Sequence, residues 1–319
     1  MALHIHILGI DNSSFPFLSG GIWVRWFFMV SGYFTCSHFS NSNNYDNYAK
    51  NAILYTLKKY LTFIPSVVTV ISIYYLFRII SERNIDVKVL NILENVLLID
   101  SLITMENPIV PLWYLSTMLW CLPVFCIICQ YRERHITTVL IFTIYLVYYN
   151  YEKQYTIPLY ITAFVNISIG IVIYEIVNWL NGVKFKQLCK YFITIFAGLI
   201  WGGLFYVTYK NCSINSEIYF FTGLIFTLTR HNKLSYVRNV IVEFLGKISS
   251  YIFIYHWLCG LIIAYIFFMA NIENNVGKIF LYYIISFIFS ICAINIEKWF
   301  KNKILIKRFL LDKCIITDE

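Results

Sequence analysis

Long apolar runs separated by short polar segments recur along the whole chain. Most of the runs have roughly the 17–25 residues that an α-helix needs to cross the hydrocarbon core of a bilayer. They do not alternate apolar and polar positions as barrel strands do, and backbone groups in lipid must be paired within the protein. We therefore predict an all-α, polytopic transmembrane helical bundle of about nine spans. The predicted spans are Gly21–Ser37, Leu61–Ile80, Ile109–Gln130, Ile136–Tyr149, Ile157–Leu180, Tyr191–Tyr209, Glu217–Thr229, Ser249–Ala270 and Ile279–Glu297.

The composition excludes a soluble domain. Hydrophobic residues make up 59% of the chain and charged residues only 13%, whereas roughly 25% of residues are charged in soluble proteins. No repeat or low-complexity tract divides the sequence, so we expect one integral-membrane domain over residues 1–319. The CxxC pair Cys126 and Cys129 lies in an apolar run without a companion pair or a nearby histidine, so we expect no metal.

The formal net charge of +8 could indicate a nucleic-acid partner, but its placement favours another explanation. If the first span runs from outside to inside, the inner loops hold eighteen of the 25 lysines and arginines, and the outer segments hold five. Inner loops of membrane proteins carry such an excess. We therefore expect a multi-pass protein surrounded by membrane lipid, with no nucleic-acid partner.

Ionisable side chains at membrane depth are costly, and they indicate function. The candidates are His4 or His6, Arg25, Glu175 and His256. Structural explanations compete with function at three of these positions. Arg25 could extend to the outer headgroups, Glu175 could pair with an inner lysine, and His256 could hold two helices together.

Four short segments carry more specific patterns. Residues 27–33 read Phe-Phe-Met-Val-Ser-Gly-Tyr, and residues 57–65 place two lysines before a proline. Residues 111–115 read Pro-Leu-Trp-Tyr-Leu, and residues 245–256 contain Gly-Lys-Ile-Ser followed by Phe253 and His256. In this order the segments resemble the signature motifs of the acyltransferase-3 family, whose members O-acylate cell-surface polysaccharides. The resemblance covers nearly the whole chain.

The chain departs from the family pattern in several places. The family's first span carries a functional histidine, and residues 1–8 resemble only the tail of that span. We therefore expect a ten-span core whose first span is truncated here. His4 fits the functional histidine best, with His6 as the alternative.

The other departures fall within the motifs. Lys59 matches the first residue of the family's Arg-x-x-Arg pair, and Thr62 replaces the second. Arg25 stands where members more often carry aspartate or proline, and Phe253 replaces a tyrosine.

The resemblance implies an O-acyltransferase, with acetyl-CoA as the default acyl-CoA donor. The implied acceptor is a sugar hydroxyl of a capsular polysaccharide, an exopolysaccharide or a lipid-linked glycan, at a bacterial plasma membrane. Histidine titrates near neutrality, so His4 or His6 is the expected base, and Arg25 or Ser31 is expected to donate to the oxyanion. The remaining expected site residues are His256 in catalysis, with Lys58, Lys59, Trp113 and Tyr114 around coenzyme A, whose phosphates suit cations at a helix start.

Two other functions compete with acyl transfer. A transporter or flippase of a polysaccharide precursor would show inverted repeats with paired, broken helices, and the glycines at 170, 198, 202, 203 and 223 show no such pairing. An inactive truncated acyltransferase or a membrane sensor is the third possibility. An in-frame apolar segment upstream of the start codon would favour the enzyme.

The distribution of basic residues predicts the orientation. Single-cysteine variants labelled in intact cells should place residues 40–59 and the tail after Trp299 inside. Residues 83–106, which hold four acidic side chains, should be labelled from outside. Outside labelling of residues 40–51 would overturn this orientation.

Overall fold

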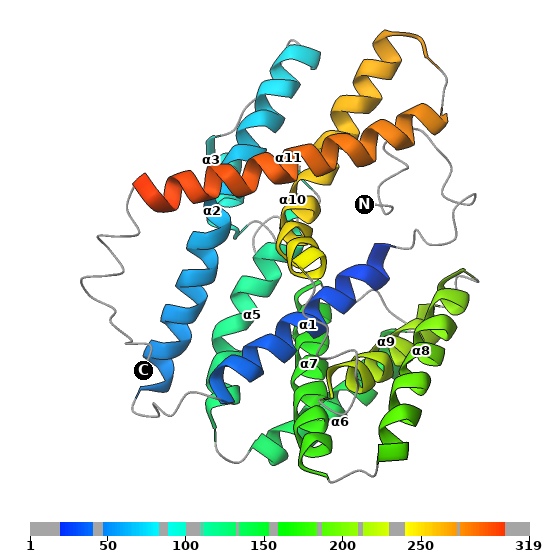
Figure 1. The fold of residues 1–319 in the computed structure, drawn as a ribbon. Helices are drawn as coiled ribbons and strands as arrows, with labels where there is room; N and C mark the ends of the chain where they lie inside the picture. The colour runs from blue at the N-terminus through cyan, green and yellow to red at the C-terminus, as the bar shows by residue number, and fades with distance from the viewer. Residues whose placement is uncertain are drawn as a thin grey trace.

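The computed structural model describes residues 20–40, 47–82, 89–99, 109, 111–131, 134–152, 159–183, 187–209, 213–229, 240–272 and 275–303. Within these residues the chain forms ten α-helices and no strand, which confirms the predicted all-α class (Figure 1). The helices are α1 (Gly20–Ser40), α2 (Tyr48–Glu82), α3 (Val89–Leu97), α5 (Leu112–Gln130), α6 (Arg134–Glu152), α7 (Leu159–Gly182), α8 (Gln187–Tyr209), α9 (Ser213–Leu228), α10 (Val240–Met269) and α11 (Asn275–Lys303).

Each predicted span is a helix in the structure. Five helices are long and apolar enough to cross a membrane by length and composition, namely α2, α5, α7, α10 and α11. Helix α2 begins thirteen residues before the predicted span, and α10 begins nine residues before it. The added turns contain lysine in both helices and glutamate in α10. These residues interrupt an apolar run but favour helix, so the helices extend beyond the apolar segments.

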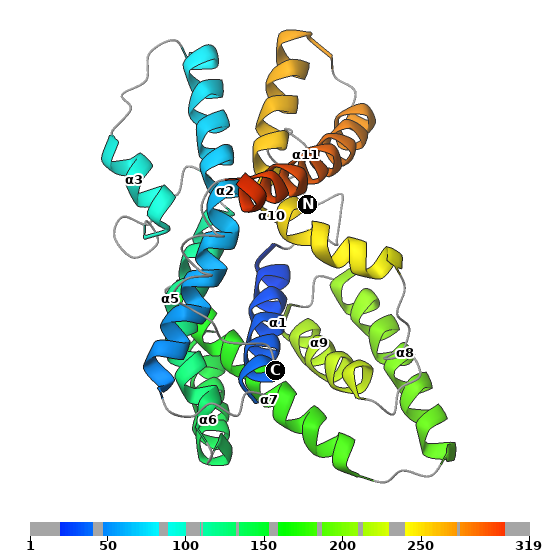
Figure 2. The same cartoon turned by 60° about the vertical axis from the view of Figure 1, so that its left-hand side comes forward.

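Helix α3 was not predicted from the sequence. Its nine residues span only about 14 Å, too short to cross a bilayer. Its polarity is inverted, because Glu94 and Asn95 are buried while its leucines and Val89 are exposed. The Tyr60 hydroxyl of α2 donates to the Val96 carbonyl at 3.3 Å, so α3 folds back beside the middle of α2 (Figure 2).

Helix α1 lies at the centre of the bundle and packs on α5, α7 and α9. At its crossing with α7 the two backbones approach unusually closely. A Cβ atom added at Gly32 would lie 2.0 Å from the Ile167 carbonyl oxygen, and one added at Gly170 would lie 2.0 Å from the Met29 carbonyl oxygen. Small residues permit such contacts between membrane helices, so this crossing fixes the rotation of α1.

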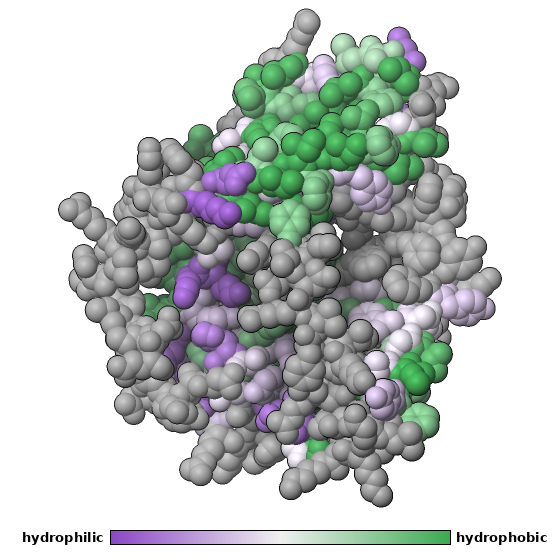
Figure 3. All heavy atoms as spheres, viewed as in Figure 1, coloured by the Kyte–Doolittle hydropathy of each residue, from purple (hydrophilic) through white to green (hydrophobic). Residues whose placement is uncertain are grey.

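Apolar side chains fill two clusters on either side of α1. One joins α1, α2, α5, α10 and α11 around Phe28, Phe125 and Tyr255. The other joins α1, α7 and α9, where Trp26 stacks on Phe220 at 4.4 Å between ring centroids. A broad apolar surface remains outside over α10 and α11 (Figure 3). Soluble proteins rarely expose so continuous an apolar patch, so it faces the bilayer.

Polar groups tie α2 to its neighbours at two levels. The Asn51 amide donates to Gln130 Oε1 at 3.2 Å, and Gln130 Nε2 donates to the Tyr48 carbonyl at 3.2 Å. These bonds join the start of α2 to the end of α5. Further along α2, the Tyr255 hydroxyl of α10 donates to the Ser66 carbonyl at 3.4 Å, directly after the helix-internal Pro65.

The glycine crossing predicts opposite effects for two glycine-to-alanine changes. Gly32→Ala should destabilise the protein by about 1–3 kcal/mol or more, because its methyl group overlaps the α7 backbone. Gly198→Ala should raise stability by up to about 1 kcal/mol, because no atom lies within 4 Å of the added methyl group and alanine favours helix. Thermal unfolding in detergent measures both. Equal melting temperatures for the two variants would contradict the close crossing.

Candidate functional site

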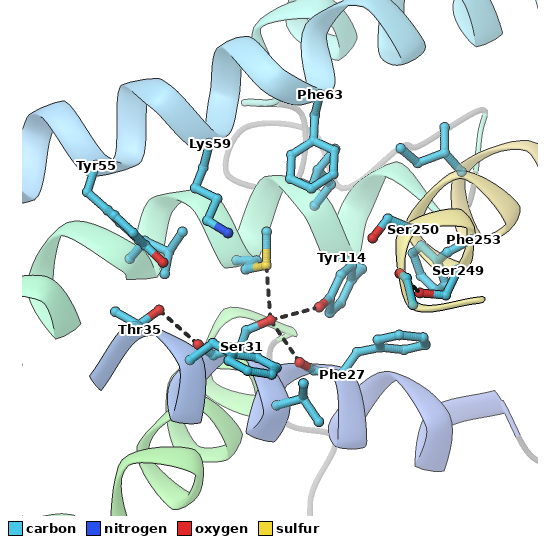
Figure 4. A pocket seen from close by; sticks show the side chains of 17 residues that line it. Phe27, Ser31, Thr35, Tyr55, Lys59, Phe63, Tyr114, Ser249, Ser250 and Phe253 are labelled. Atoms are coloured by element: carbon cyan, nitrogen blue, oxygen red, sulfur yellow. Dashed lines mark hydrogen bonds between the residues drawn. The ribbon is translucent and has the colours of Figure 1, made fainter. Parts of the chain in front are cut away.

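A cavity of about 350 Å³ lies between α1, α2, α5 and α10. Helix α1 packs on α5, α5 on α2, and α2 on α10, and side chains from all four helices close the space (Figure 4). The volume is at the small end of ligand pockets, which run from about 300 to 1,000 Å³. The cavity therefore accommodates reacting groups rather than a whole nucleotide.

Each of the four sequence motifs contributes side chains to this one cavity. Ser31 comes from α1, Lys59 from α2, Tyr114 from α5 and Phe253 from α10. These residues are far apart in the sequence, and the helix packing brings them together. The sequence motifs thus converge on a single site.

Ser31 and Tyr114 form a pair of hydroxyl groups at the centre of the cavity. Ser31 Oγ donates to the Phe27 carbonyl at 2.8 Å and lies 3.3 Å from the Tyr114 hydroxyl. A serine hydroxyl has one proton, and the short bond to the Phe27 carbonyl takes it. The Tyr114 hydroxyl therefore donates to Ser31 in this arrangement, and Ser31 could donate to an oxyanion only by leaving the Phe27 carbonyl.

Aromatic rings from three helices hold this pair in place. The Tyr114 ring centroid lies 4.5 Å from that of Phe28 and 5.0 Å from that of Phe253. Phe27 lies 5.4 Å from Phe253, across the gap between α1 and α10. Tilted and edge-on rings at these distances attract one another, so the ring cluster forms one wall of the cavity.

Lys59 places a positive charge at one end of the cavity. Its ammonium points into the cavity (Figure 4) and lies 5.6 Å from the centroid of the Tyr55 ring. Among the described residues that line the cavity, it is the only lysine, and no arginine, aspartate or glutamate lies there. Lys58 is exposed and does not line the cavity, so the two lysines differ in position although they are adjacent in sequence.

Helix α10 forms the other end of the cavity with Gly246, Ser249, Ser250, Phe253 and Ile254. These positions recur every three or four residues, which places them on one helix face. The Ser249 hydroxyl donates to the Gly246 carbonyl of its own helix at 2.8 Å. A methyl group at Gly246 would meet no atom within 4 Å, so the wall is open there.

His256 does not line the cavity, although we expected it among the catalytic residues. The cavity ends at Phe253 and Ile254, short of His256. The His256 side chain is buried, and its Nδ1 lies 2.7 Å from the Phe253 carbonyl oxygen. Because a carbonyl only accepts, Nδ1 carries the proton. His256 lies behind Phe253, with 5.8 Å between the ring centroids.

Four other expected site residues lie away from the cavity or outside the described part of the chain. Arg25 does not lie on the face of α1 that carries Ser31 and lines the cavity, so it is not positioned to donate there. Trp113 packs against Phe28 at 6.2 Å between ring centroids and does not line the cavity. His4 and His6 lie outside the described residues.

The structure adds cavity residues that we did not predict from the sequence. Tyr55 and Phe63 line the cavity four residues on either side of Lys59. Phe27 and Ser250 lie on the same helix faces as Ser31 and Phe253. Their signal in the sequence is spacing, because positions three or four residues from a site residue share its face.

The hydroxyl pair predicts a measurable coupling between α1 and α5. Tyr114→Phe and Ser31→Ala should each lower the free energy of unfolding. The double variant should lose less than the sum of the two single losses, and the difference, which is the coupling energy of the two hydroxyls, should be about 0.6 kcal/mol. Ser168→Ala is the control, because Ser168 donates within its own helix to the Phe164 carbonyl. Its effect should add to that of Tyr114→Phe. Full additivity of the Ser31 and Tyr114 changes would contradict the bond.

Comparison with known proteins agrees with the convergence of the motifs. The sequence matches the acyltransferase-3 family, described as an acyltransferase domain, over residues 1–295. Neither the curated proteins nor the solved structures include a match to the chain. Because the family match covers most of the chain, and because the helices are those of a multi-pass membrane bundle, the chain belongs to the acyltransferase-3 family and is a membrane acyltransferase.

Proposed function

We propose that this protein transfers an acyl group, by default acetyl, from an acyl-CoA to a sugar hydroxyl of a surface polysaccharide or a lipid-linked glycan. The observation that carries the proposal is one cavity in which Lys59, the Ser31–Tyr114 pair and the hydroxyls of α10 lie in line. A cation suits a phosphorylated donor. Hydroxyl groups suit both a developing oxyanion and a sugar.

In the proposed reaction the acceptor hydroxyl attacks the thioester carbon. A base takes the hydroxyl proton, the new C–O bond forms, the C–S bond breaks, and the coenzyme leaves as the thiol after protonation at sulfur. We assign the base to His4, or failing that to His6. We assign stabilisation of the oxyanion to the hydroxyls of Tyr114 and Ser31 rather than to Arg25, because both hydroxyls line the cavity and Arg25 does not.

The size of the cavity indicates which part of an acyl-CoA donor it can hold. About 350 Å³ holds a thioester arm and part of an acceptor, and the nucleotide must remain outside. Lys59 lies at the rim and Lys58 is exposed beside it, so both are available to the phosphates. The charge bias of the loops favours the inner side of the membrane for this end, and we take that membrane to be a bacterial plasma membrane with acyl-CoA on its inner side.

The proposal predicts a change in surface glycan. Cells with the gene should carry glycan O-acyl groups that cells without it lack, as measured by mass spectrometry of purified polysaccharide. Replacing both His4 and His6 by alanine should lower acyl transfer by about 10²–10⁴-fold at equal protein level. His135→Ala, in the first turn of α6, is the control and should retain transfer. Unaltered glycan in the deletion strain would refute the proposed function.

A further inference from the structure

The two ends of the cavity differ in chemistry. At one end Lys59 and Tyr55 of α2 present an ammonium beside an aromatic ring. At the other end α10 presents Ser250 and Phe253, with no charged side chain among the described residues that line it. Figure 4 shows the two ends on opposite sides of the Ser31–Tyr114 pair. The ammonium end therefore suits a phosphorylated donor, and the hydroxyl and ring at the α10 end suit a substrate that carries hydroxyl groups.

The two serines of α10 are not equivalent. The Ser249 hydroxyl donates to the Gly246 carbonyl, so its proton is used within the helix. The Ser250 side chain is exposed, lines the cavity, and turns its hydroxyl toward the cavity centre (Figure 4). Ser250 can both donate and accept a hydrogen bond. It is therefore suited to a ligand that is itself a hydroxyl compound.

The surfaces next to Ser250 complete the shape of a sugar site. Phe253 and Phe27 meet at 5.4 Å and form an apolar wall, which suits the face of a pyranose ring that carries its C–H bonds. Gly246 lacks a side chain and leaves open space. A ring that enters there can rest on the aromatic wall while a hydroxyl group reaches Ser250.

We infer that the acceptor sugar binds at the α10 end of the cavity, against Phe253 and with a hydrogen bond to Ser250. This inference rests on the proposed function and assigns the substrate of one half of the same site. The donor thioester approaches from the Lys59 end, so the two substrates meet at the Ser31–Tyr114 pair. Ser250 is a binding residue for the acceptor, and Lys59 is a binding residue for the donor.

The test separates the two substrates kinetically. The full chain is purified in lipid nanodiscs and assayed with acetyl-CoA and with surface polysaccharide of the source cell, stripped of esters by mild alkali. Ser250→Ala should raise KM for the polysaccharide about three- to tenfold, the effect of losing one hydrogen bond, with KM for acetyl-CoA unchanged. Lys59→Met should raise KM for acetyl-CoA and leave KM for the polysaccharide unchanged. Ser290→Ala, whose serine donates to the Ser286 carbonyl within α11, is the matched control and should change neither constant.

Three outcomes decide between the proposals. If the unaltered protein transfers no acetyl group to the stripped polysaccharide, the proposed function fails and the acceptor site fails with it. If transfer occurs but Ser250→Ala leaves the acceptor KM unchanged, or raises both KM values equally, the acceptor site is wrong and the function stands. A rise with Ser249→Ala alone also overturns the assignment. Ser250→Gly replaces the alanine variant if that variant does not purify as a monodisperse protein.

Discussion

The close contact between the backbones of α1 and α7 determines which side chains of α1 face the cavity. Lipid tails are as apolar as the helices, so membrane helices associate through packing rather than through the hydrophobic effect. Gly32 and Gly170 let α1 meet α7 backbone to backbone. Because Ser31 precedes Gly32 in the same helix turn, this contact directs Ser31 away from α7 and toward α5. The orientation of the central hydroxyl pair is therefore set by two residues that have no side chain.

The sequence alone was sufficient to predict the helices that form from long apolar runs. Every predicted span is a helix in the structure, and five of these helices are long and apolar enough to cross a membrane. Helix α3 was not predicted because it is too short to span a bilayer and its position depends on packing against α2. Its polar side chains Glu94 and Asn95 are buried, while its leucines and Val89 are exposed. Such an inversion becomes visible only when the neighbouring helix is known.

Residue identity proved easier to predict than the direction in which a side chain points. The motifs led to Ser31, Lys59 and Tyr114, and all three line the cavity. They also led to Arg25 and His256, which lie outside it, because a sequence does not show where four helices stop enclosing a space. That limit depends on non-local contacts such as the ring of Phe253 against Phe27. Ser250 was missed for the same reason, since its neighbour Ser249 carried the motif.

Pro65 has a mechanical consequence for α2. Proline has no N–H group, so the Leu61 carbonyl receives no helical hydrogen bond from position 65. Gln130 holds α2 on one side of this point, near Tyr48, and Tyr255 holds it on the other, at Ser66. The helix lacks one backbone hydrogen bond at this point, so it bends most easily in the turn before Pro65. Phe63 lies within that turn and Lys59 lies two residues before Leu61, so the wall of the cavity most easily displaced is the one that carries its charge.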